Sequence, residues 1–106
     1  RTDSAGGWKL CPELKPTAEV NATPGFFVAC GSCTRDTAGC VTSPNYPMNY
    51  TGHEACYIDV TGDVEAIQVE DFATEASYDM LWVNGQNYSG SEGPDGIRPS
   101  GQLVWS

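Results

Sequence analysis

Glu75 and Asp79 are the carboxylates whose spacing best suits shared chemistry in this 106-residue chain. They flank a predicted turn between two apolar stretches, residues 67–69 and 80–83, so their side chains can converge on one cation. Calcium takes several hard oxygen ligands and favours a site with two or three carboxylates. The two acids therefore predict a calcium site, and the alternative is that they are ordinary solvated loop acids.

The cysteines form the second chemically informative set: Cys11, Cys30, Cys33, Cys40 and Cys56. An odd number leaves one thiol over if all bridges are internal, and that thiol is either free or bridges to another chain. Cys30 and Cys33 have C-x-x-C spacing, but no second pair supports zinc and no βαβ pattern supports a redox fold. Disulfides, and hence an oxidising compartment, are the expected use of this set.

Three N-x-Ser/Thr acceptor sequences, at Asn21, Asn49 and Asn87, indicate the same compartment. Pro24 follows the first of them directly and should hinder its modification, so Asn49 and Asn87 are the better candidates. A glycan is bulky and must face solvent. Together with the cysteines, these acceptors predict a secreted, extracellular glycoprotein that carries N-linked glycans.

Residues suited to catalysis are few. His53 is the only histidine, and no serine in a nucleophile elbow accompanies it. Glycoside hydrolysis needs two carboxylates across a cleft, and a domain of this size offers no obvious cleft. We therefore expect a protein that is not an enzyme.

Charge and hydropathy exclude two kinds of partner. The net charge is −9 with only 5 Lys and Arg, so the surface repels nucleic-acid backbones and anionic membranes. No apolar run approaches the roughly 20 residues that a membrane span needs. The chain is long enough for one domain with a modest core.

The elements that must position these residues are short strands. Alternating or apolar stretches predict strands at residues 6–10, 26–30, 56–60, 66–70, 80–83, 86–88 and 102–105. Asn84-Gly85 is the strongest short hairpin signal in the chain. Trp8, Trp82 and Trp105 lie in alternating stretches, so all three are expected in the core; the alternative is a sugar-binding platform. No helix of useful length is predicted, and the fold class is an antiparallel β-sandwich.

The segment from Cys40 to Val60 reads CVTSPNYPMNYTGHEACYIDV. Its hydrophobic-Thr-Ser-Pro-Asn-Tyr-Pro-x-Asn-Tyr stretch, with the cysteine and short strand that follow, resembles the opening of a CUB domain. VEDFATEASYDMLWVNG, at residues 69–85, and GPDGIRPSGQLVWS, at residues 93–106, resemble later segments of that family in the same order. The resemblance implies a CUB-like sandwich of the jelly-roll type.

The resemblance also implies a cysteine pairing. The family-like spacing pairs Cys40 with Cys56. Cys11 stands at the end of what looks like the closing strand, which should meet the opening strand at Cys30 or Cys33.

A third implication concerns calcium. The ligands of calcium-binding CUB domains resemble a Glu after the Phe segment, the Asp of Tyr-Asp, and an Asp in the closing loop. These match Glu75, Asp79 and Asp3, with Tyr50 as a hydrogen-bonding support. The match at Asp3 departs from the family pattern because two extra residues lengthen or shift that loop.

The chain ends before the Ser-Asp loop and final strand with which CUB domains close, whereas residues 1–11 resemble that loop and strand. This predicts that residues 1–11 close a neighbouring CUB-like domain, that residues 12–25 form a Pro-rich linker, and that residues 26–106 lack their own final strand. The first strand is then expected to end at Pro12. The alternative is a monomer whose first strand folds back into its own sheet.

These expectations lead to a structural function. A late strand at residues 103–105 with an open edge would accept a strand from another copy, and repetition of that contact would give a filament. We therefore expect a repeat or subunit of an extracellular, glycosylated assembly whose partners are copies of itself. The alternative is a calcium-dependent module that binds another extracellular protein or a carbohydrate.

Overall fold

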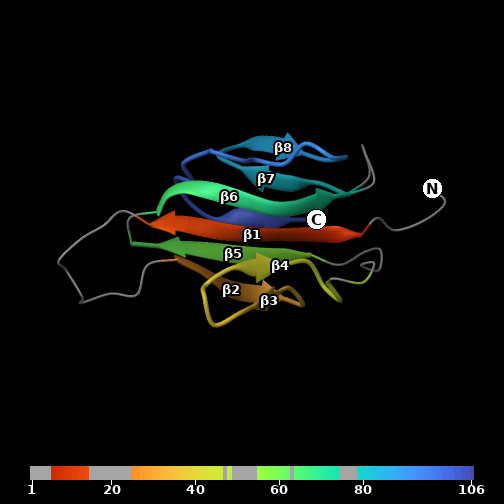
Figure 1. Ribbon diagram of the computed structural model, residues 1–106, viewed down its shortest axis with the longest axis horizontal. Helices are drawn as coiled ribbons and strands as arrows, with labels where there is room; N and C mark the ends of the chain where they lie inside the picture. The colour runs from red at the N-terminus through yellow and green to blue at the C-terminus, as the bar shows by residue number, and fades with distance from the viewer. Residues whose placement is uncertain (1–5, 15–24, 47, 49–54, 63, 75–78) are drawn as a thin grey trace.

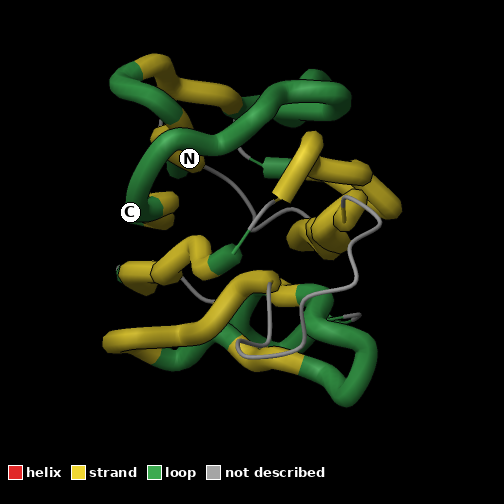
Figure 2. Tube along the Cα trace, turned by 90° about the vertical axis from the view of Figure 1, so that its left-hand side faces the viewer, coloured by secondary structure: helices red, strands yellow, loops and turns green. Residues whose placement is uncertain are grey.

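The computed structural model describes residues 6–14, 25–46, 48, 55–62, 64–74 and 79–106. In these ranges the chain forms strands and loops and no helix (Figure 2). The strands are β1 (Gly7–Leu14), β2 (Gly25–Gly31), β3 (Thr34–Arg35), β4 (Val41–Thr42), β5 (Cys56–Thr61), β6 (Val64–Ala73), β7 (Leu81–Val83), β8 (Gln86–Tyr88) and β9 (Leu103–Trp105).

Two antiparallel sheets make up the fold (Figure 1). The four-stranded sheet has the order β3-β4-β1-β6, and the five-stranded sheet has the order β2-β5-β9-β7-β8. Alternate residues of β5, β7 and β9 are buried between the two sheets. The predicted all-β antiparallel sandwich is confirmed.

The first strand lies inside the four-stranded sheet of its own chain. Lys9 pairs with Thr42 of β4 on one side and with Asp71 of β6 on the other. The prediction that this strand pairs with residues 103–105 is therefore wrong, because β9 belongs to the other sheet. In this structure the first strand completes the four-stranded sheet of its own chain.

The first strand also runs past Pro12, where it was predicted to end. Pro12 pairs with Ile67 of β6, and the strand continues to Leu14. A proline lacks an N–H group and is tolerated where one edge of a strand is free. Because β4 pairs only with Lys9 and Leu10, β1 has a neighbour on one side only at Pro12.

The expected open edge of the last strand is also absent. Trp105 of β9 pairs with Cys56 of β5 on one side and with Leu81 of β7 on the other. β9 is therefore an interior strand, and no vacancy beside it calls for another strand.

Two tryptophans join the layers at the centre of the core. Trp8 of β1 and Trp105 of β9 are buried, and their ring centroids lie 5.6 Å apart at an interplanar angle of 68°. This edge-to-face geometry is favourable for aromatic pairs. Both residues are core residues as predicted, whereas the expectation that a donated Trp8 lies away from Trp105 of its own chain is wrong.

Two sheet edges are covered by other parts of the chain. Along β6, the Ile67 N–H donates to the carbonyl of Ile97 (2.8 Å), and the Gly96 N–H donates to the carbonyl of Ile67 (2.8 Å). Along β2, Arg35 Nε donates to the carbonyl of Phe26 (2.7 Å), with the guanidinium 4.3 Å from the ring centroid of Phe27. Covered or charged edges discourage uncontrolled pairing with other chains.

Candidate functional site

The disulfides differ from the predicted pairing. Cys11 is bonded to Cys40, with Cα atoms 4.1 Å apart, and Cys33 is bonded to Cys56, with Cα atoms 5.9 Å apart. The predicted Cys40–Cys56 bridge is wrong, and so is the predicted bridge from Cys11 to Cys30 or Cys33.

Strand register explains the observed pairing. Leu10 lies opposite Val41 in the β1–β4 pair, and antiparallel register then places residue 11 opposite residue 40. Cys56 opens β5 in the other sheet, opposite Gly31, close in sequence to Cys33. Each disulfide thus follows from a strand pairing that spacing along the sequence does not reveal.

Cys30 is the remaining cysteine. A register shift between Val28 and Cys30 lies in the β2–β5 pair, and it leaves Cys30 opposite Tyr57 with its side chain exposed. Of the five cysteines, all of which the structure describes, it is the one without a disulfide.

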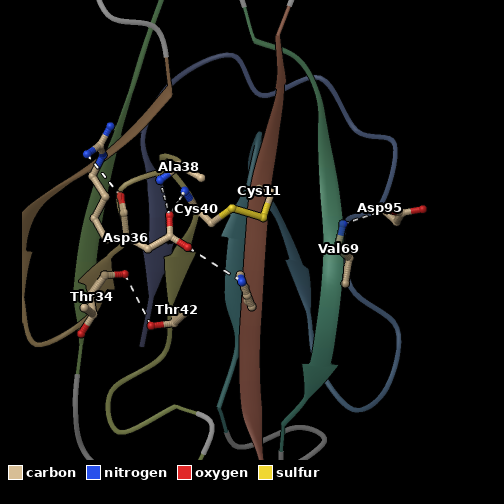
Figure 3. The surroundings of a disulfide bond; sticks show 10 residues. Cys11, Thr34, Asp36, Ala38, Cys40, Thr42, Val69 and Asp95 are labelled. Carbon is tan, nitrogen blue, oxygen red and sulfur yellow. Dashed lines mark hydrogen bonds and ion pairs between the residues drawn. A yellow bond between two sulfur atoms is a disulfide. The ribbon is translucent and has the colours of Figure 1, made fainter.

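The Cys11–Cys40 bridge fixes β1 in its position between β4 and β6 in the four-stranded sheet, which we call the slot. Asp36 braces the β4 side of this slot, because its Oδ1 accepts hydrogen bonds from the N–H groups of Ala38 (2.9 Å) and Cys40 (3.0 Å) (Figure 3). The other oxygen of Asp36 lies 3.8 Å from the ammonium group of Lys9 on β1. Both side chains of this ion pair are partly exposed, so the pair contributes little to stability.

The opposite end of the slot is closed by Ser43. The Trp8 N–H donates to Ser43 Oγ (3.0 Å), and the Ser43 N–H donates to the carbonyl of Trp8 (3.0 Å). Ser43 is buried, and a Cβ atom on Gly7 would collide with its hydroxyl oxygen. Gly7 also has a φ of 96°, a conformation that favours glycine.

Tyr46 and Asp71 link the two walls of the slot. The Tyr46 hydroxyl donates to Asp71 Oδ2 (3.0 Å), and Asp71 lies opposite Lys9 in the β1–β6 pair. Burial and the hydrogen bond to Asp71 raise the pKa of Tyr46 above its ordinary value. Nearer the other end of β6, Gln68 Nε2 donates to Glu13 Oε2 of β1 (3.3 Å).

This arrangement can receive and retain one strand. The slot supplies backbone pairing on both sides, a buried pocket for Trp8, a serine clamp at one end and a disulfide near its middle. Sequence reasoning missed Asp36 and Ser43. The signal for Asp36 is the stretch Asp36-Thr37-Ala38-Gly39, whose side-chain bonds to the following backbone are typical of an Asp-initiated turn.

Of the residues predicted to form the calcium site, the structure describes only Asp79. Asp79 is buried, with 7% of its surface exposed, whereas Glu75, Asp3 and Tyr50 lie outside the described residues. Within the described ranges, no three His, Cys, Asp or Glu side chains are grouped so that they could hold a metal ion. The calcium site stays a prediction.

Of the three predicted glycosylation sites, the structure describes only Asn87. Asn87 is exposed on β8, at the edge of the five-stranded sheet. Asn21 and Asn49 lie outside the described residues, as does His53.

Comparison with known proteins leaves the family open. No protein-family model matches the chain, and no solved structure matches it significantly. The resemblance to CUB domains therefore stays a prediction. The part of the chain that the structure describes contains no helix long and apolar enough to cross a membrane.

Proposed function

We propose that this protein is a non-enzymatic structural subunit of an extracellular, glycosylated assembly, in which neighbouring copies are linked head to tail by exchange of β1. The two disulfides support an oxidising environment. The segments that resemble CUB domains fit a secreted module of this kind. The observation that carries the proposal concerns the connection between β1 and β2. The end of β1 lies close to the start of β2, yet the segment that joins them is longer than this short distance requires.

The ends of these strands are neighbours in space. A Cβ atom on Gly25, the first residue of β2, would lie 3.8 Å from Cγ of Pro12 near the end of β1. Yet ten residues, 15–24, separate Leu14 from Gly25. β1 and β2 belong to different sheets, and connections between the elements of a compact domain have a median length of only about 4–6 residues.

The surplus length permits exchange. A Pro-rich segment spans about 3.1 Å per residue when extended, so ten residues reach about 30 Å. That exceeds the roughly 26 Å length of an eight-residue strand. The connector can therefore carry β1 into the equivalent slot of a neighbouring copy.

Exchange would keep every contact that β1 makes here. Pairing with β4 and β6, the Ser43 clamp and the packing of Trp8 on Trp105 would all be made with a neighbour instead of the same chain. Such a swap has a low energetic cost because the contacts are identical. A chain that gives its strand to one neighbour and receives a strand from another forms a heterologous contact, which grows into a filament. In that form the Cys11–Cys40 disulfide joins copies covalently.

The test is the size of the protein under denaturing conditions without reductant. An exchanged assembly should run as a ladder of covalent multimers that collapses to one band on reduction. The double variant C11A/C40A should lose the ladder, and the matched double variant C33A/C56A should keep it. A single monomer band before reduction would contradict the proposal, and a ladder lost on Cys30→Ser would assign the link to Cys30 instead.

The second candidate function is a calcium-dependent module that binds an extracellular partner. Asp79 favours it, because it is the one carboxylate that the fold buries among the described residues. It is also the residue that matches the Asp of the Tyr-Asp pair in the calcium-binding CUB domains that the sequence resembles.

Calcium should then raise the melting temperature, since an ion that binds only the folded state stabilises it by mass action, by about 2.7 kcal/mol at one hundred times the dissociation constant. Asp79→Asn should abolish this response. Asp59→Asn is the matched control, since Asp59 is exposed on β5 and accepts a hydrogen bond from Gln102. Melting curves that coincide in calcium and in chelator would reject the site.

A further inference from the structure

One row of side chains crosses the outer face of the five-stranded sheet. Cys30 lies opposite Tyr57, Tyr57 opposite Val104, Val104 opposite Trp82, and Trp82 opposite Asn87. Residues directly opposite one another in antiparallel strands point to the same face. The row therefore takes one residue from each of β2, β5, β9, β7 and β8.

The middle of this row is an uncharged apolar stripe made of Tyr57, Val104 and Trp82. Tyr57 is 47% exposed and Trp82 is 37% exposed, whereas the neighbours of each along its strand point inward and are buried. Trp82 is thus not a core residue, contrary to its predicted place. An exposed stripe of aromatic side chains marks a surface that can bind a ligand, and the net charge of −9 disfavours an anionic ligand.

Asn87 stands at one end of the stripe and starts the acceptor sequence Asn87-Tyr88-Ser89. It is exposed on β8, the edge strand, so its amide is accessible. Directly opposed residues in antiparallel strands have Cβ atoms about 4.5–5.5 Å apart. The first sugar attached to Asn87 would therefore begin beside the indole ring of Trp82.

We propose that Trp82 is the docking platform for an N-linked glycan on Asn87, with the sugars nearest the protein lying along the stripe toward Val104 and Tyr57. This inference rests on the glycosylated character of the proposed function. The apolar C–H face of a neutral sugar ring complements the face of an aromatic ring by burial and dispersion. The stripe extends across three strand spacings from Asn87, about 14 Å, so it can accommodate more than one sugar.

The covalent attachment makes a weak contact sufficient. A tethered ligand has an effective concentration in the millimolar range, so stacking that is negligible for a free sugar becomes significant here. The docked glycan would cover the exposed stripe.

The experiment compares the secreted, glycosylated protein with the variant Asn87→Gln, each with Trp82 present or replaced by alanine. Peptide mass mapping first establishes occupancy at Asn87. With Trp82 present, loss of the glycan should lower the melting temperature by about 3–6 °C and raise acrylamide quenching of tryptophan fluorescence, because Trp8 and Trp105 are buried. With Trp82→Ala the glycan should make no difference to either readout. Trp82→Phe should restore part of the shift, and Tyr57→Ala should preserve most of it.

Three results would overturn this assignment, and they are distinguishable. An unmodified Asn87 in secreted material removes the glycan itself and counts against the glycosylated assembly. An occupied Asn87 with the same melting and quenching as Asn87→Gln removes only the docking on Trp82. Dimerisation of Asn87→Gln that is abolished by Trp82→Ala, with an occupied glycan giving no shift, would assign the stripe to a second copy.

Discussion

Replacing Trp8 by alanine should lower the free energy of unfolding by about 3–5 kcal/mol, the usual cost of truncating a large buried aromatic residue. Trp8 has no exposed surface, and it meets Trp105 edge to face at the junction of the two sheets. Its removal leaves a cavity that both layers border. The loss is a large part of the total stability of a domain of this size and should be visible as a lower urea midpoint.

Trp82→Ala is the matched control because it removes the same side chain from the outer face. With 37% of its surface exposed, it should cost about 1 kcal/mol or less in protein that lacks glycans. Equal losses for the two variants would contradict the assignment of Trp8 to the core and Trp82 to the surface.

Removal of the Cys33–Cys56 disulfide should be the second large effect. The bridge spans 23 residues of sequence, and the chain-entropy model gives a loss of about 3.5 kcal/mol for a loop of that size. Cys56 is also fully buried, and its Sγ accepts a hydrogen bond from the Cys33 N–H (2.9 Å). The variant C33A/C56A should therefore melt many degrees below the unaltered protein.

Cys30→Ser serves as the control for this experiment. Cys30 is exposed and forms no disulfide in the described chain, so its replacement should leave the melting temperature nearly unchanged. A substantial loss in Cys30→Ser with little loss in C33A/C56A would mean that the pairing is different from the one seen here.

Local patterns were sufficient to predict most strands. The alternation at residues 66–70 falls within β6, and the apolar stretch at residues 26–30 falls within β2. The Asn84-Gly85 turn is present, with φ of 53° and 82°, as a tight turn between two hydrogen-bonded strands requires. These features depend on residues that are close in sequence, so a pattern along the chain reveals them.

Pairing between distant strands could not be predicted in the same way. β4 has only two residues, Val41 and Thr42, which are too few to show any periodicity. Its register against β1 nevertheless determines which cysteine lies opposite Cys11. The three residues of β7 alternate without saying which face is buried, so Trp82 was assigned to the core. The register between distant strands is set by the packing of the whole sandwich. Neither the two residues of β4 nor the alternation in β7 therefore reveals it.

In the candidate site too, local features could be predicted from the sequence and contacts between distant segments could not. Asp36 lies in a turn that the sequence indicates, but its role as a brace for Cys40 needs β1 beside β4. The closeness of Pro12 and Gly25 likewise appears only in three dimensions, although the length of the connector is visible in the sequence.

The most direct test of strand exchange follows the chain of origin of each half of the Cys11–Cys40 disulfide. Heavy-isotope and normal chains are mixed in equal amounts, unfolded with reductant, refolded and oxidised together, and digested without reduction. Exchange predicts that disulfide-linked peptides containing Cys11 and Cys40 carry mixed labels as often as matched labels, while Cys33–Cys56 peptides carry matched labels only. Matched labels alone at both disulfides would show that β1 stays with its own chain and would contradict the proposed assembly.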